Sequence, residues 1–288
     1  MTVVAVPATR GGLRDPIERL AQDKGALLGL AILGITIALA VLAPIVSPYD
    51  PIEQQIVLRG QGPSAEHPLG LDEVGRDLLS RILFGARITV GGAAGAVTLA
   101  AIAGVAIGLL AGSAHRRLDN LLMRIADGML AFPSIIIAIL LVVFLGPGIT
   151  SSIAAVAIAD IPGYARLMRG QTLAIREQDY VRAAAAVGAS PLRVALRHVL
   201  PNTIPPIVVY SSLQIGSAII RLASLSFLGF GAQPPDPEWG AMLNSAQQWL
   251  GTAPHISLVP GLAIVALVVA FNLVGDGVRD ALDPRASR

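Results

Sequence analysis

Six long apolar stretches constrain the fold of this chain more than any other feature. They lie at residues 26–46, 88–111, 126–145, 149–168, 204–227 and 256–274. A helix needs about 20 apolar residues to cross a hydrocarbon core of roughly 30 Å. Only 14% of the 288 residues are charged, against about 25% in soluble domains. The sequence therefore predicts an all-α membrane protein with six transmembrane helices.

The basic residues predict how these helices are oriented. Segments on the cytoplasmic side of membrane proteins carry an excess of Lys and Arg. If the amino terminus lies inside, the inner segments hold sixteen basic residues and the outer segments hold four. Both termini are therefore expected in the cytoplasm. The inner set is Arg10, Arg14, Arg19, Lys24, Arg116, Arg117, Arg124, Arg166, Arg169, Arg176, Arg182, Arg193, Arg197, Arg279, Arg285 and Arg288, and the outer set is Arg59, Arg76, Arg81 and Arg87.

This orientation divides the chain into successive parts. Residues 1–25 lack the apolar run of a signal peptide and are expected to form a cytoplasmic tail, followed by the first transmembrane helix at 26–46. Residues 47–87 are expected outside, 88–275 as a five-helix core, and 276–288 as a second cytoplasmic tail. Within residues 74–84, Leu and Ile recur at helical spacing opposite Arg76 and Arg81, which predicts a separate helix on the outer membrane surface.

The inner loop at residues 171–202 reads as two short helices joined by an elbow. Asp179 is expected to cap the first helix, and Gly188 supplies the left-handed residue that ends it. Ser190 and Pro191 provide a cap and a first-turn proline for the second helix, and Pro201 is expected to end it. The pattern leaves two interpretations open: a surface on which another protein docks, or an amphipathic segment that lies on lipid headgroups.

Two ionisable residues fall inside apolar runs, where a charge costs a few kcal/mol. Asp160 lies in the fourth run and Arg221 in the fifth. Both side chains can face a water-filled translocation path, or they can pair with each other. A third interpretation, an intramembrane aspartyl protease that uses Asp160 and Asp276, is disfavoured because Asp276 lies at the inner boundary near Arg279.

Prolines and glycines mark the remaining breaks. Gly146, Pro147 and Gly148 predict a tight turn between two antiparallel helices. Pro133 and Pro162 fall within the third and fourth runs, where membrane helices tolerate proline. Cys is absent, which excludes disulfides and thiolate metal sites, and we expect no metal site and no catalytic residue in this chain.

The elbow resembles a motif shared by permease subunits of binding-protein-dependent ABC importers. Ala183, Ala184, Gly188, Leu200 and Pro201 match its spacing, whereas Arg182 and His198 replace its Glu and Ile. Segments 67–77, 225–240 and 272–285 resemble signatures of the dipeptide and oligopeptide permeases, in the same order along the chain. The resemblance is to the C-type permease of the pair and implies the ABC type I importer permease fold.

The resemblance also implies partners and a location. These are a homologous B-type permease, two ABC ATPase subunits, an extracytoplasmic substrate-binding protein and the lipid bilayer of a bacterial inner membrane, with no nucleic acid. The only lysine, Lys24, precedes Gly25 and Ala26, so the chain lacks a phosphate-binding loop. ATP and Mg are therefore expected on the partner ATPases, and no cofactor on this chain.

The resemblance assigns roles to the residues of three regions. It makes Arg182, Ala183, Ala184, Gly188, Leu200 and Pro201 the ATPase-coupling residues, and the outer loop with Pro234, Pro235 and Trp239 a candidate surface for the binding protein. The prolines of that loop have a second interpretation, as a stiff cap over the helices. Dipeptides or oligopeptides are the expected substrates, nickel complexes and glutathione are alternatives, and a self-contained secondary transporter is the competing class of function.

Overall fold

The computed structural model describes residue 18 and residues 20–282, and this part of the chain is helical, without a β-strand. The long helices are α2 (Lys24–Val46), α3 (Leu78–Ser113), α6 (Ile149–Arg176), α9 (Leu200–Phe227) and α11 (His255–Leu282). The shorter elements are η1 (Ile56–Leu58), α4 (Arg116–Leu130), α5 (Ser134–Leu145), α7 (Asp179–Ala186), α8 (Pro191–Val194), the π-turn η2 (Ala195–Val199), α10 (Trp239–Ala246) and η3 (Gln247–Trp249).

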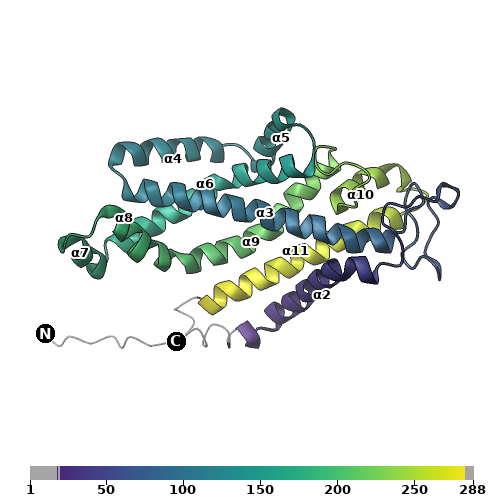
Figure 1. Ribbon diagram of the computed structural model, residues 1–288, viewed down its shortest axis with the longest axis horizontal. Coiled ribbons are helices and arrows are strands. Elements are labelled where there is room, and N and C mark those ends of the chain that lie inside the picture. Colours follow the sequence, from purple (N-terminus) through teal and green to yellow (C-terminus); the bar gives the residue numbers. More distant parts are fainter. Residues whose placement is uncertain (1–17, 19, 283–288) are drawn as a thin grey trace.

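The long helices run side by side along the longest axis of the molecule (Figure 1). Helix α3 packs along α6, and α11 packs against both α2 and α9. Helices α7 and α8 lie at one end of this bundle, and α10 lies near the opposite end with the segment between α2 and α3. The two ends of the molecule therefore carry different structures. One end is the helical elbow formed by α7 and α8, and the other is a cap formed by residues 47–77 together with α10 and the loop before it.

Glycines set the distance between α3 and α6. Gly104, Gly108 and Gly112 recur every four residues and so lie on one face of α3. A Cβ atom at Gly108 would lie 2.4 Å from the carbonyl oxygen of Ala165, and one at Gly104 would lie 2.3 Å from the Cβ of Tyr164. Small residues at this spacing let two membrane helices approach closely, so this face fixes the α3–α6 contact.

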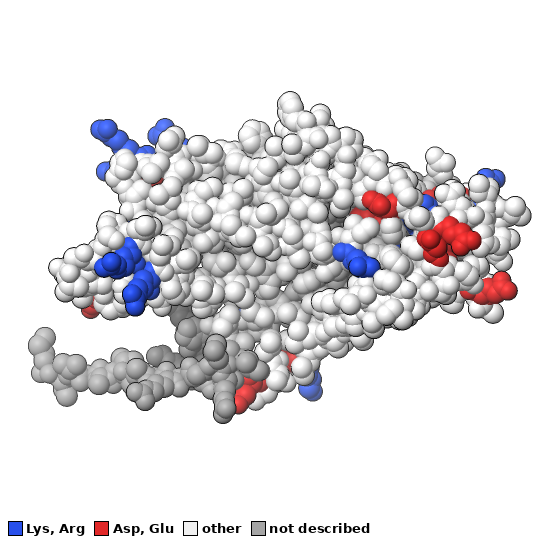
Figure 2. All heavy atoms as spheres, viewed as in Figure 1, with Lys and Arg blue, Asp and Glu red and all other residues white. Residues whose placement is uncertain are grey.

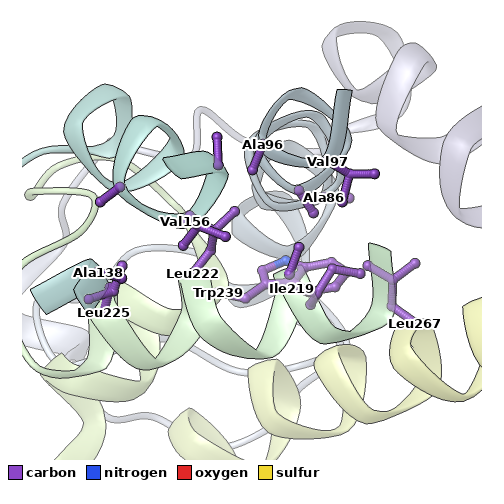
Figure 3. Close-up of a cluster of buried hydrophobic side chains, with 14 of the residues drawn as sticks. Ala86, Ala96, Val97, Ala138, Val156, Ile219, Leu222, Leu225, Trp239 and Leu267 are labelled. Atoms are coloured by element: carbon purple, nitrogen blue, oxygen red, sulfur yellow. The ribbon is translucent and has the colours of Figure 1, made fainter. Parts of the chain in front are cut away.

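The main core lies where α3, α6 and α9 meet α10 and α11. Buried alanines of α3 and Val156 of α6 contact Ile219, Leu222 and Leu225 of α9, as Figure 3 shows. Trp239 at the start of α10 belongs to the same cluster. The side chains that face outward are also large and apolar; Ile45, for example, is 81% exposed, as expected of a surface that contacts lipid tails.

The third expected span is not one straight helix. Residues 126–145 are divided between α4 and α5, which meet at an angle of 94°. Pro133 lies at the break and is the N-cap residue of α5, because a proline has no N–H to donate within a helix and restricts the residue before it. The turn at Gly146–Gly148 forms as predicted, with φ angles of +87° and +152° at the two glycines.

The fold gives fewer long apolar helices than the six apolar runs predict. Among the described residues, four helices are long and apolar enough to cross a membrane, and five if the bent α4–α5 pair counts as one. Helix α6 has sufficient length at 28 residues, but it carries Asp160, Arg166, Arg169 and Arg176.

The separate surface helix expected at residues 74–84 does not form. Helix α3 starts at Leu78 and continues without a break to Ser113, and the Asp77 side chain caps it by accepting from the Ser80 N–H. Arg76 and Arg81, expected on the solvent side, are 5% and 3% exposed. The prediction was wrong because Arg76 pairs with Asp72 and Glu73, and Arg81 donates to the carbonyl oxygens of Pro51 and Pro235, so neither arginine faces solvent.

Pro201 does not end the second elbow helix either. Helix α8, the π-turn and α9 form one continuous helix, Pro191–Phe227. The Leu200 N–H bonds to the Ala195 carbonyl in the wider π pattern, and Pro201 follows in the first turn of α9. A local π adjustment of this kind accommodates the N–H that proline lacks, so the helix continues through it.

Candidate functional site

The elbow forms as the sequence predicts at its bend. Helix α7 ends in a Schellman motif: the Gly188 N–H donates to the Ala185 carbonyl and the Ala189 N–H to the Ala184 carbonyl, over 3.0 and 3.1 Å. Gly188 has a φ of +91°, the left-handed conformation that favours glycine. No atom lies within 4 Å of a Cβ built there, so the backbone conformation alone requires glycine.

The caps of the two short helices differ from each other. Ser190 caps α8 by accepting from the Arg193 N–H, with Pro191 in the first turn, as predicted. Asp179 is not the cap of α7, because Gln178 occupies that position and Asp179 is the first helical residue. There its carboxylate still lies near the positive end of the helix dipole.

The underside of the elbow is anchored to the rest of the bundle. Val181 of α7, Val194 of α8 and Val199 of the π-turn are buried together with Met168 and Ile175 of α6. In contrast, Val187 at the tip is 86% exposed. The elbow is therefore a packed unit with an exposed tip. On the face that Figure 2 shows, Lys and Arg gather at this end of the molecule, and most of the visible Asp and Glu lie toward the other end.

The six expected coupling residues lie on two elements, α7 with its bend and the start of α9. Arg182 and Ala183 are exposed, Ala184 is half-buried, and Gly188 is exposed at the bend. Leu200 and Pro201 lie beyond the π-turn at the start of α9. The elbow surface is thus formed by α7 and the bend, and Leu200 and Pro201 belong to its connection with α9.

Asp160 and Arg221 form an ion pair. An Nη of Arg221 lies 2.5 Å from an Oδ of Asp160. The Arg221 side chain is 15% exposed and the Asp160 side chain 5%. The pair joins α6 to α9, and one turn along α6 the Tyr164 hydroxyl donates to the Ser211 hydroxyl over 3.0 Å. Sequence reasoning left pairing and path-facing open; the structure shows that the two side chains pair.

A second charged cluster holds the outer cap together. Asp72 accepts from the Arg76 guanidinium over 2.6 Å, and a second nitrogen of Arg76 lies 2.6 Å from Glu73. Burial raises the pKa of Glu73, and the neighbouring Asp72 carboxylate raises it further. Arg81 reaches across to the carbonyl oxygens of Pro51 and Pro235, at 2.9 and 3.3 Å. These residues hold the cap against the start of α3.

The loop after α9 presents two of the three residues expected to face a binding protein. Pro234 and Pro235 are exposed and are joined by a cis peptide bond. Trp239 is only 2% exposed, and its indole N–H donates to the Ile82 carbonyl over 3.2 Å. The expectation that Trp239 belongs to the outer surface is therefore wrong, because the indole is a core side chain that locks α10 onto α3.

Several residues that hold this arrangement were missed by the sequence reasoning. The Gly104, Gly108 and Gly112 repeat was visible as a small residue at every fourth position. Glu238 lies in the loop after α9, yet the residue is only 1% exposed and its carboxylate caps α10. No local pattern indicates that burial.

Two family models match the chain in succession. Residues 104–288 match the binding-protein-dependent transport system inner membrane component, and residues 13–63 match the N-terminal TM domain of oligopeptide transport permease C. Together these models cover the elbow, the Asp160–Arg221 pair and the first transmembrane helix.

Relatives match over nearly their whole length. The dipeptide transport system permease protein DppC of Alkalihalophilus pseudofirmus is 43% identical over 94% of this chain and 90% of its own. The glutathione transport system permease protein GsiD of Pectobacterium atrosepticum is 46% identical over 92% of this chain and 88% of its own. Among solved structures, an inward-facing MetNI methionine ABC transporter matches with a TM-score of 0.57 at 21% identity, over 72% of this chain and 97% of that one.

Proposed function

The chain belongs to the family of binding-protein-dependent transport system inner membrane components, and on this basis we propose that it is the C-type permease subunit of an ATP-driven importer of short peptides. The observation that carries the proposal is the near full-length similarity to both DppC and GsiD. Glutathione is itself a tripeptide, so dipeptides, oligopeptides and glutathione share one chemistry. Nickel complexes remain the alternative cargo.

The proposed subunit has six spans and both termini in the cytoplasm of a bacterium. In this arrangement the bent pair α4–α5 serves as the third span and α6 as the fourth. The gathering of basic residues at the end with α7 and α8 supports the orientation (Figure 2). Two ABC ATPases then meet this end, a B-type permease completes the path, and a binding protein approaches the outer loop with Pro234 and Pro235.

The elbow is the proposed point of contact with one ATPase. Apolar side chains are exposed both on α7 and at the bend, where Tyr180 is 46% and Val187 86% exposed, and a group of exposed apolar side chains on one surface marks a docking site. The alanines of α7 allow another protein to approach closely. Since α8 continues through the π-turn into α9, a displacement of the elbow is passed directly to a membrane-spanning helix.

We propose a structural role for the Asp160–Arg221 pair. The low exposure of both side chains supports it, because a group that binds substrate must be open to the path. The pair keeps α6 and α9 together while the elbow moves, and the Tyr164–Ser211 hydrogen bond supports the same contact.

An uptake assay tests the proposal. The chain is expressed with its B-type permease, both ATPases and the binding protein, and uptake of a labelled dipeptide is measured. Uptake should require the ATPase genes. Unlabelled dipeptide and unlabelled glutathione are added as competitors, and the one that lowers uptake of the labelled dipeptide more is the preferred substrate. Full uptake by the chain expressed alone would instead identify a secondary transporter.

The same assay tests the elbow with the substitution Gly188→Val. A β-branched residue in the left-handed conformation costs about 1–2 kcal/mol, or a factor of 5–30 in an equilibrium. Uptake should fall by about that factor while the subunit stays in the membrane and ATP hydrolysis continues. Gly170→Val is the matched control, since Gly170 lies on α6 with no atom within 4 Å of an added Cβ. Unchanged uptake by Gly188→Val would contradict the coupling role.

A further inference from the structure

Two cavities adjoin where the elbow meets the end of α3. The first, of about 260 Å³, is lined by Arg176 of α6, Arg182 of α7 and Ser113, the last residue of α3. The second, of about 400 Å³, is lined mainly by apolar side chains, among them Leu110 and Leu192. Ser113, Pro191 and Ala195 line both cavities, so the two adjoin, and the first supplies a polar half and the second an apolar half.

The polar half offers hydrogen-bond donors. Arg176 donates to the Gly112 carbonyl from one terminal nitrogen, and its guanidinium makes no other hydrogen bond to the described residues. Arg182 is exposed and forms no ion pair within the described part of the chain. The Ser113 hydroxyl oxygen is buried without a hydrogen-bond partner. No acidic residue lines either cavity, so this half is suited to an anion.

The apolar half lies beside the outward-facing surface of the bundle. Leu110 is 51% exposed and Leu192 is 68% exposed. Both belong to helices that are long and apolar enough to cross a membrane. A soluble anion would leave these side chains uncovered, whereas a molecule with an anionic head and an apolar tail would fill both halves.

We propose that the joined cavities bind an anionic glycerophospholipid. Its phosphate contacts Arg176, Arg182 and the Ser113 hydroxyl, and one acyl chain lies along Leu110 and Leu192. The lipid then bridges the end of α3 to the elbow. This binding depends on insertion in a bilayer and not on the transported substrate, so it is measured on the subunit without the rest of the importer.

The test uses the full chain in lipid nanodiscs with a reporter, Leu192→Trp. The two native tryptophans, Trp239 and Trp249, lie in α10 and η3, near the opposite end of the molecule from the elbow. Phosphatidylglycerol with brominated acyl chains should quench the reporter more than brominated phosphatidylcholine at equal mole fraction. One arginine near a membrane surface contributes about 1 kcal/mol to anionic lipid binding. Arg182→Gln and Arg176→Gln should therefore each reduce the preference for phosphatidylglycerol over phosphatidylcholine about fivefold.

Arg193→Gln is the matched control, because Arg193 follows the reporter on α8 but lines neither cavity. It should leave the preference unchanged. An equal loss with Arg193→Gln would show a diffuse surface charge effect and overturn the proposal. Full reversal by soluble glycerol phosphate would assign the site to free anions and overturn it as well. Native mass spectrometry of the wild-type chain, which should retain phosphatidylglycerol over phosphatidylcholine, checks the result without the reporter.

Discussion

A single buried carboxylate holds the turn between α9 and α10. Glu238 accepts from the Ala241 N–H over 2.8 Å and lies 3.4 Å from the Thr89 hydroxyl. No cation is paired with it among the described residues. Burial raises the pKa of Glu238, which means that the folded state favours the protonated form. The ionised Glu238 carboxylate therefore destabilises the folded state at pH values above the raised pKa. This destabilisation is removed as the pH falls through that pKa and the carboxylate is protonated.

Glu238→Gln should therefore stabilise the subunit at high pH. The amide keeps an oxygen for the Ala241 N–H but carries no charge. We expect the melting temperature in detergent to exceed that of the wild type by at least about 2 °C at alkaline pH, with a difference that shrinks as the medium is acidified. Glu53→Gln, at an exposed position, is the control and should have no such effect. A difference in melting temperature between Glu238→Gln and the wild type that does not change with pH would contradict a raised pKa at Glu238.

Residues near each other in sequence were the ones that could be predicted. Gly188, Ser190 and Pro191 act on their own backbone or on the next turn, and their conformations form as expected. Trp239 was placed on the wrong side because its partner, Ile82, is 157 residues away. Pairing of Asp160 with Arg221, 61 residues apart, stayed one of two interpretations for the same reason.

At the scale of helices, the contact between α3 and α6 depends on the absence of side chains. Gly108→Leu should drive a branched side chain into the Ala165 carbonyl and the Met168 side chain. Overpacking costs about 1–3 kcal/mol, so the melting temperature in detergent should drop by about 2–12 °C. Gly91→Leu on the same helix, with no atom within 4 Å of an added Cβ, should be close to neutral. Equal effects at the two positions would exclude a special α3–α6 contact.

The pair between α6 and α9 gives a second prediction at this scale. Removing one partner of a buried ion pair costs about 3–5 kcal/mol, whereas replacing both by apolar residues is often neutral. Asp160→Leu and Arg221→Met should each lower the yield of folded subunit, and the double variant should recover both yield and uptake. If the double variant folds but does not transport, the charges act on substrate and the structural role is wrong.

Breaks within helices were the hardest elements to predict. Pro133 and Pro201 have the same local signature, a proline next to apolar residues, yet the first lies at a bend of 94° and the second within a continuous helix. The π-turn directly before Pro201 distinguishes the second site. Val194, which precedes that turn, and Val199, its last residue, are buried against Met168 and Ile175 of α6. Such packing is not encoded in the pattern of the segment itself.

At the scale of the whole molecule, the orientation is directly testable because the chain has no cysteine. Two single-cysteine variants serve as probes. Val57→Cys places a cysteine at the cap, where Val57 is 96% exposed, and Val187→Cys places one at the elbow tip. A membrane-impermeant maleimide should label Val57→Cys in spheroplasts and Val187→Cys only after the membrane is opened. The wild-type chain, which cannot react, is the background control. The opposite labelling pattern would invert the proposed topology.

The continuous helix from the elbow into the bundle has a mechanical consequence. Its 37 residues make a stiff rod about 55 Å long, since each residue adds about 1.5 Å. If the rod tilts by about 5° at one end, simple geometry moves its far end by about 5 Å over that length. The π-turn, with its looser hydrogen bonding, is where such a rod would bend first. Small adjustments on one side of the membrane are thereby magnified on the other.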